Sequence, residues 1–217
     1  MQIIVINSQK GGSAKTMLAK HLSVEAERAG DGPVFLIDTD PQGSLTAWHS
    51  KRESESPALA EVAFDGLAKG LEIIRRRGAA YCFVDTGSGR LDIASDLFKL
   101  ANFVIFPVQP SEDDLTAAPK TVDALETARV PFVFVLTRVK SGTLITAQAA
   151  ARLSKRGEVA ETFINDRTGY KSPYPKGQTI TEAEPRGVAA KEIALLWTNI
   201  KTCIHASMQT AKEHAHG

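Results

Sequence analysis

Cysteine is scarce in this chain of 217 residues, and its two cysteines, Cys82 and Cys203, stand far apart in apolar segments. This spacing excludes a disulfide framework, and it excludes a four-ligand zinc or iron–sulfur site within one chain. We therefore expect a protein of a reducing compartment.

An excess of one charge is also missing, because 26 lysines and arginines face 25 aspartates and glutamates, for a net charge of +1. No global field demands nucleic acid or a membrane as partner, so any DNA binding must come from a local patch. The apolar run Met1–Asn7 lacks a basic region and is far too short for a signal peptide or a membrane span. We expect a cytoplasmic protein without a membrane partner.

The hydrophobic fraction of 43% is enough to build the core of one ordinary domain, residues 1–217, without cross-links. Short runs rich in β-branched and aromatic residues recur along this domain. Most of these runs are continuously apolar, which is typical of strands buried on both faces of a parallel sheet. The predicted strands are Gln2–Asn7, Val34–Ile37, Tyr81–Val84, Phe103–Val108, Pro131–Leu136 and Glu161–Ile164.

Helical stretches separate these strands. The predicted helices are Lys15–Arg28, Ala58–Arg77, Asp113–Ala128, Thr143–Lys155 and Val188–Ala211. This alternation predicts a doubly wound α/β fold, a mainly parallel sheet with helices on both faces. Two stretches look irregular, Lys51–Pro57 and Asn165–Gly187, and a loop as long as the second is more often functional or mobile than accidental.

A glycine turn between the first strand and the first helix is the strongest chemical signal. Residues 10–16 read Lys-Gly-Gly-Ser-Ala-Lys-Thr. A strand, a turn and a helix N-terminus in this order place successive backbone N–H groups where they can surround phosphate oxygens. Lys15 would neutralise the β- and γ-phosphates of a nucleotide, and the Thr16 hydroxyl would ligate Mg²⁺. A plain glycine turn with two surface lysines is the alternative.

The same segment resembles the deviant phosphate loop of the ParA and MinD class of ATPases, K-G-G-x-x-K-[ST]. Gln9 and Ala14 occupy the two glycine positions of the generic pattern, and Lys10 is the extra lysine of the deviant form. The resemblance implies ATP and Mg²⁺ as cofactors, and it implies that Lys10 reaches across a homodimer interface to the partner's ATP. The expected nucleotide-binding residues are Lys10, Gly11, Gly12, Ser13, Ala14, Lys15, Thr16 and Met17.

Two residues of this loop depart from the family pattern. The family usually has glycine at the position of Ala14, and a methyl group there is costly if the residue needs a positive φ. Met17 replaces a threonine or serine that the family often shows near the α-phosphate. These departures put the nucleotide affinity and the rate of hydrolysis in question.

Two later segments end predicted strands with carboxylates, at the sheet edge where ligands bind. Residues 38–44, Asp-Thr-Asp-Pro-Gln-Gly-Ser, are similar to the second motif of the ParA family. By this resemblance Asp40 positions the attacking water and is catalytic with Lys10 and Lys15, while Asp38 lies in the Mg²⁺ environment. Asp85 follows an apolar strand, as in a Walker B motif, and would hold Mg²⁺ through a water or through Thr16.

ParA proteins with bound ATP usually grip DNA without sequence preference, through cations on phosphates. The candidates lie in or beside the long late loop, although any one of them is more often a solvated surface charge. They are Lys155, Arg156, Arg167, Lys171 and Lys176.

The resemblance implies an ATP-switched dimer associated with the nucleoid, which partitions plasmid or chromosomal DNA. A ParB-like centromere-binding protein or a cargo adaptor would stimulate hydrolysis and release. The chain begins directly with the first strand, so we expect no helix-turn-helix extension and no reading of an operator. Three alternatives stay open: the positioning of a protein cargo, a MinD-like regulator of cell division, and a nucleotide-binding scaffold that does not hydrolyse ATP.

Overall fold

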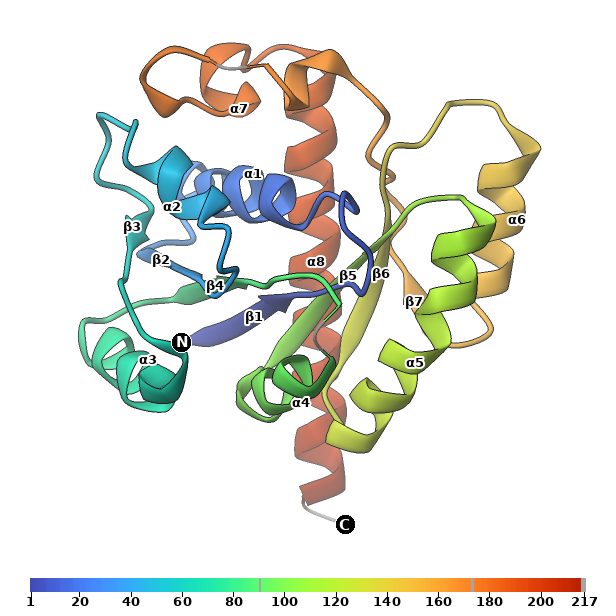
Figure 1. Cartoon of the computed structure of the whole chain (residues 1–217), viewed down its shortest axis with the longest axis horizontal. Helices are drawn as coiled ribbons and strands as arrows, with labels where there is room; N and C mark the ends of the chain where they lie inside the picture. Colours follow the sequence, from blue (N-terminus) through green and yellow to red (C-terminus); the bar gives the residue numbers. More distant parts are fainter. Residues whose placement is uncertain (90, 173, 216–217) are drawn as a thin grey trace.

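A seven-stranded parallel sheet runs through the computed structural model of the chain (Figure 1). The structure describes residues 1–89, 91–172 and 174–215, and gives side chains for all of these except 91–93 and 211–215. The strand order is β3-β2-β4-β1-β5-β6-β7. The strands are β1 (Gln2–Ile6), β2 (Val34–Asp38), β3 (Ala58–Leu59), β4 (Tyr81–Asp85), β5 (Phe103–Val108), β6 (Phe132–Leu136) and β7 (Glu158–Val159).

The central strands are apolar along their whole length because helices cover both of their faces. β1 lies between β4 and β5, and all six residues of β5 are buried. The helices are α1 (Lys15–Arg28), α2 (Ser44–His49), α3 (Leu67–Arg76), α4 (Leu91–Leu100), α5 (Glu112–Ala128), α6 (Leu144–Leu153), α7 (Ile180–Ala183) and α8 (Val188–Ala215).

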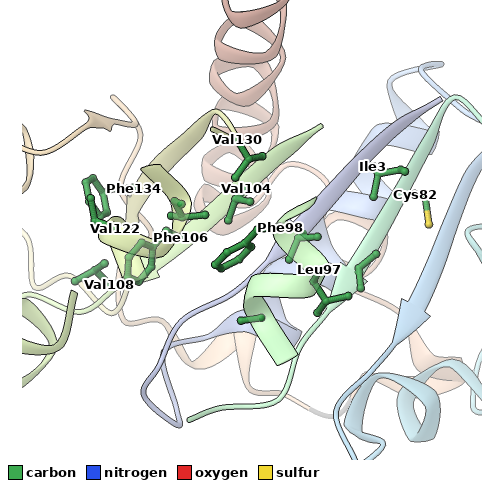
Figure 2. Packing of buried hydrophobic residues seen from close by; sticks show 14 of the residues in the cluster. Ile3, Cys82, Leu97, Phe98, Val104, Phe106, Val108, Val122, Val130 and Phe134 are labelled. Atoms are coloured by element: carbon green, nitrogen blue, oxygen red, sulfur yellow. The ribbon is translucent and has the colours of Figure 1, made fainter. Parts of the chain in front are cut away.

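Each face of the sheet has its own hydrophobic core. On one face α3, α4, α5 and α6 pack against the strands, with Phe98 of α4 beside β5 and Phe106 against Phe134 at 5.2 Å between ring centroids (Figure 2). On the other face α1, α2, α7 and α8 enclose the second core, in which Trp197 is 1% exposed and donates its indole N–H to Asp31 Oδ2 at 2.7 Å. The predicted doubly wound α/β fold is confirmed.

The predicted strand Glu161–Ile164 is wrong. The seventh strand has only two residues, Glu158–Val159, which pair with β6. After Val159 the chain begins to leave the sheet. Ala160 and Ile164 still donate their N–H groups to carbonyls of β6, but Thr162 N–H turns away to Asn199 Oδ1 of α8. The apolar pattern therefore marks the buried side chains correctly, although the backbone between them does not continue the ladder.

The predicted helix Ala58–Arg77 is also wrong in its first half. Ala58–Leu59 pairs in parallel with Phe35–Leu36 as the edge strand β3, and α3 begins only at Leu67 after a short 3-10 turn. The predicted helices do not include α4, which carries Leu97 and Phe98 into the core. The predicted helix Lys15–Arg28 is confirmed with the bounds of α1, and the three remaining predicted helices differ from the observed ones by a few residues at their ends.

The late segment is irregular apart from two 3-10 turns over residues 165–172 and 174–179, as expected, but Ile180–Ala183 forms the short helix α7, which was not predicted. Specific contacts hold the described part of this segment. Arg167 and Tyr170 contact Glu192 of α8, and Arg52 donates two hydrogen bonds to the Glu182 carboxylate. The segment thus forms a fixed wall above α1 and α2 (Figure 1). None of the helices in the described ranges is long and apolar enough to cross a membrane.

Candidate functional site

The glycine turn after β1 is held in place from two neighbouring strands. Gln109, just beyond β5, donates its side-chain N–H to Gly12 O at 3.0 Å, and Thr137, just beyond β6, donates its hydroxyl to Ser13 O at 3.1 Å. Within the turn the buried hydroxyls of Ser8 and Ser13 lie 2.5 Å apart. The turn is therefore fixed at the carboxyl edge of the sheet, where parallel sheets bind ligands.

The backbone of this turn has unused hydrogen-bond donors. The N–H groups of Gly11, Gly12 and Ala14 have no acceptor among the described residues. They lie just before the first turn of α1, whose N-terminus carries a partial positive charge. Such a row of N–H groups is an anion-binding concavity, which favours a phosphate.

Lys15 is almost fully buried at 6% exposure, yet it lacks an ion pair in the described part of the chain. Its ammonium donates to the Ser88 hydroxyl at 2.6 Å and to Lys10 O at 3.5 Å. Burial lowers the pKa of Lys15, while the carboxylates of Asp85 and Asp40 raise it. A buried cation held only by neutral oxygens is ready to bind an anion.

Asp85 is the complementary buried carboxyl group at the end of β4. It is 0% exposed, and neither of its carboxylate oxygens has a hydrogen-bond partner in the described structure. Burial raises the pKa of Asp85 to about 7, against a smaller lowering effect of the neighbouring Thr16 side chain. An orphaned carboxylate beside a hydroxyl is a suitable pair of oxygen ligands for Mg²⁺.

Asp38 and Asp40 belong to the loop between β2 and α2. Asp38 Oδ2 accepts from the Thr46 N–H at 2.9 Å and from its hydroxyl at 3.1 Å, and so satisfies a donor in the first turn of α2. Asp38 Oδ1 accepts from the Asp40 N–H at 3.1 Å. With both oxygens occupied, Asp38 is less available to a metal than Asp85, and its role as a ligand stays a prediction.

Asp40 faces the phosphate loop. One oxygen accepts from the Gln42 N–H at 3.0 Å and fixes the loop, and the carboxylate lies beside Gly87. Its charge raises the pKa of both Lys15 and Asp85. The structure therefore brings the three predicted residues Lys15, Asp40 and Asp85 to one place.

Lys10 points away from this place, toward its own chain. Its ammonium lies 3.1 Å from Asp113 Oδ2 and 3.1 Å from Asp114 Oδ1, at the start of α5. Hydrogen bonding to Asp113, and then to Asp114, raises the pKa of Lys10. Lys10 and Asp113 are exposed while Asp114 is buried, and an ion pair at the surface is worth little free energy, so the lysine can exchange partners.

The sequence reasoning does not name two residues of the site, Ser88 and Arg138. Arg138 follows β6, has a φ of 52°, and directs its guanidinium toward Gly12. Beside it lies a cavity of about 90 Å³ that is lined by Ala14 and Met17. Both residues could have been identified from their position in the sequence, just beyond a buried strand at the carboxyl edge of the sheet.

The candidate DNA-binding residues do not form one surface. Arg156 pairs with Asp123 at 2.7 Å and with Glu126 at 3.4 Å, near the end of α5. Lys155 and Arg156 follow α6, which starts at the carboxyl edge of the sheet and returns to its amino edge. They therefore lie at the opposite edge from the phosphate loop.

The other three candidates lie in the late segment and are each paired with a carboxylate. The pairs are Arg167 with Glu192 at 2.5 Å, Lys171 with Asp166 at 2.6 Å and Lys176 with Glu53 at 2.9 Å. These pairs reduce the positive charge that the isolated cations would present to phosphates.

Ala14 adopts the left-handed conformation, with φ 77° and ψ 21°, which strains a residue with a Cβ. We expect Ala14→Gly to raise the free energy of unfolding by about 0.5–1 kcal/mol, because the relief of strain exceeds the added freedom of the unfolded chain. Urea unfolding of the ligand-free protein measures this change. The control Ala147→Gly, at an exposed position inside α6, should lower the same free energy by about 1 kcal/mol. If both substitutions changed the free energy of unfolding in the same direction, this would contradict the proposed strain at Ala14.

Asp85 makes the stability of the ligand-free chain depend on pH. Its pKa of about 7 in the folded chain lies above that of the unfolded chain, so the unfolded chain loses the proton first and stability falls as the pH rises toward 7. Asp85→Asn removes this loss. The free energy of unfolding of Asp85→Asn minus that of the unaltered chain should increase by on the order of 2 kcal/mol when the pH rises from about 5 to about 8. Urea unfolding at both pH values tests this, with the exposed Asp65→Asn as control; a difference that does not change with pH would contradict it.

The chain matches a family model described as the CobQ/CobB/MinD/ParA nucleotide binding domain over residues 4–180. It is 24% identical over 198 residues to Maintenance of carboxysome distribution protein A of Halothiobacillus neapolitanus, covering 87% of this chain and 91% of that protein. It is 26% identical over 189 residues to Protein ParA of Rhizobium radiobacter, covering 82% and 84%.

The fold is similar to that of a solved structure of the septum site-determining protein MinD of Pyrococcus horikoshii, complexed with Mg-ADP. The TM-score is 0.75 at 15% identity, and the match covers 95% of this chain and 98% of that one. The family match spans the phosphate loop and the segments that contain Asp38, Asp40 and Asp85. The chain therefore belongs to the CobQ/CobB/MinD/ParA family of nucleotide-binding domains.

Proposed function

We propose that the chain binds ATP with Mg²⁺, hydrolyses it slowly, and uses ATP to switch between a monomer and a homodimer that positions cargo on DNA. The observation that carries this proposal is the pair of buried, unpaired charges at the phosphate loop, Lys15 and Asp85. Lys15 lacks an anionic partner, which a nucleotide phosphate supplies, and Asp85 lacks a cationic partner, which the metal ion supplies.

Thr16 and Asp85 would hold the metal. The described residues contain no group of three histidine, cysteine or acidic side chains that could hold an ion by itself. Mg²⁺ usually takes one or two protein oxygens together with phosphates and water, and two such oxygens are present here. When bound, the ion neutralises charge that develops on the transferred phosphate.

Lys15 and the open N–H groups of the turn would bind and orient the phosphates. Asp40, held by the Gln42 N–H and close to Lys15, would orient the attacking water in line with the γ-phosphate. The small cavity beside Ala14 and Met17 would take up part of the nucleoside, next to the Arg138 guanidinium. The Mg-ADP in the structurally similar MinD protein supports this choice of ligand.

Lys10 supplies the switch in this proposal. In the single chain its ammonium is held by Asp113 and Asp114, at the surface beside the phosphate loop. A nucleotide bound to a second chain offers more negative charge than these two carboxylates and would draw Lys10 across a dimer interface. ATP binding would thus be coupled to dimerisation.

The cargo has two candidates, which share the ATPase cycle and DNA as the track. Partition of a plasmid or a chromosome through a ParB-like adaptor is favoured by the similarity to a protein named ParA. Positioning of a protein body through its own adaptor is favoured at least as much, by the similarity to carboxysome distribution proteins. The third alternative, regulation of cell division, rests on shared fold with MinD alone.

Two substitutions separate hydrolysis from dimerisation. We expect Asp40→Ala to reduce ATP turnover roughly 100-fold or more while ATP-driven dimers persist, because the water loses its orienting group. We expect Lys10→Ala to keep ATP binding but to lose those dimers. Phosphate release and light scattering after size exclusion measure the two properties, with the exposed Asp65→Ala as control. A Lys10→Ala protein that dimerises with ATP like the unaltered chain would refute the switch.

DNA binding should require ATP. Four of the five candidate cations are neutralised within the chain, so these five residues present little free positive charge in a single chain, and a dimer doubles what remains. We expect the affinity for a duplex of arbitrary sequence to be at least about 10-fold higher with ATP and Mg²⁺ than with ADP or without nucleotide. Fluorescence anisotropy at several salt concentrations measures it. Equal affinity in the three states would mean that nucleotide does not gate DNA binding.

A further inference from the structure

A second and larger cavity lies on the other side of Tyr170 from the phosphate loop. It has a volume of about 380 Å³ and is lined by α1, α2 and residues 169–172, 174 and 177–179 of the late segment. None of residues 8–17 lines it, whereas Tyr170 and Lys171 line both this cavity and the small one beside Ala14. It is therefore separate from the site described above.

The charged side chains around this cavity are all positive. They are Lys20, Lys51 and Lys171, and the described lining residues include no aspartate or glutamate. Lys171 is neutralised by Asp166 at 2.6 Å. Lys20 and Lys51 have no ion pair within the described residues, so two positive charges face this space without a counter-charge.

Lys20 is half-buried, which makes its unpaired charge costly. Its ammonium lies 5.6 Å from the ring centroid of Trp48, a contact that compensates the charge only in part. Burial lowers the pKa of Lys20 and the nearby Lys51 lowers it further, against the opposing effect of Asp85 and Asp38. An anion in the cavity would offset both the burial and the repulsion between the two lysines.

His21 adds a buried polar group whose Nδ1 atom has no partner among the described residues. It is 4% exposed, its Nδ1 atom accepts or donates no hydrogen bond, and its ring stands edge-on to Tyr170 at 5.5 Å between centroids. Burial lowers the pKa of His21 to about 3, so the ring is neutral and has one N–H to donate. Ser44 and Thr179 contribute hydroxyls to the same lining.

We propose that this cavity binds a phosphate-bearing anion, with Lys20 and Lys51 as its main charge partners. A phosphate has several oxygens that accept hydrogen bonds from ammonium, hydroxyl and imidazole groups at once, whereas a single carboxylate leaves most of these donors unused. The volume admits more than one phosphate group. The source is either a soluble phosphate compound or a phosphodiester of nucleic acid, and the shared chemistry is the same for both.

Both walls of the cavity continue into the nucleotide site. α1 begins at the phosphate loop, and α2 is held by Asp38 through the Thr46 N–H and hydroxyl. The binding of an anion to Lys20 does not depend on ATP hydrolysis, so the proposal stands apart from the function proposed above. It can be tested in a protein that has lost Lys15.

The test uses inorganic pyrophosphate, titrated without Mg²⁺ into Lys15→Ala, in which the phosphate loop has lost its cation. We expect saturable binding by calorimetry, with a change in the fluorescence of Trp48, because the second tryptophan, Trp197, is buried in the core. The fluorescence change should vanish in Lys15→Ala/Trp48→Phe while the calorimetric signal remains. The loss of the fluorescence change in the variant without Trp48 thus assigns that change to this cavity.

The decisive comparison adds Lys20→Gln and Lys51→Gln to the Lys15→Ala background. We expect the affinity for pyrophosphate to fall at least about 10-fold, since two charge-assisted contacts are lost. The matched control Lys69→Gln with Lys120→Gln removes the same charge from exposed positions of α3 and α5, on the opposite face of the sheet, and should leave the affinity within about twofold. An affinity that is equal in the two double variants would overturn the proposal.

A competition arm identifies the source of the phosphate. A short DNA duplex that displaces pyrophosphate from Lys15→Ala, and does so only when Lys20 and Lys51 are present, supports a phosphodiester as the occupant. A duplex that leaves pyrophosphate in place supports a soluble phosphate compound. Unchanged thermal melting of the glutamine variants ensures that a loss of binding reflects lost charge and not lost structure.

Discussion

Two opposite charges buried without partners determine how this site is built. Lys15 and Asp85 lie near each other at the carboxyl edge of the central strands, yet they form no ion pair, and only neutral oxygens satisfy the lysine. A direct pair would have stabilised the chain at the expense of ligand binding. The frame around them, a buried strand on each side and hydrogen bonds from Gln109 and Thr137 to Gly12 O and Ser13 O, fixes the glycine turn that carries Lys15.

The sequence predicts the fold correctly where the residues buried in the core also form the regular backbone hydrogen bonds of a strand or a helix. The central strands are apolar on both faces and α1 has a clear inner stripe, so their positions follow from pattern. The errors in the strands concentrate at the edges of the sheet. β3 and β7 have two residues each, too few for a pattern to appear, and their pairing depends on neighbours far along the chain.

The sequence places the ends of the strands beside Lys15, Asp40 and Asp85 at one edge, because strands of a parallel sheet bring their ends together there. The roles of these residues rest on the resemblance to the ParA family and stay predictions. Spacing could not reveal that Lys10 lies against Asp113 and Asp114, since they are about a hundred positions away. Nor could it show that Asp38 caps α2, or that most of the late cations are neutralised by carboxylates from other segments.

The left-handed conformation of Ala14 has a consequence for how this chain can change over time. Alanine and glycine codons differ in a single base, so the loop is one mutation away from the glycine that related loops usually carry. Larger side chains at this position would meet the same backbone strain without the small size that makes alanine tolerable. The position is therefore confined to a very short list of residues, and a change there would alter the loop's rigidity before it altered any group that contacts the phosphates.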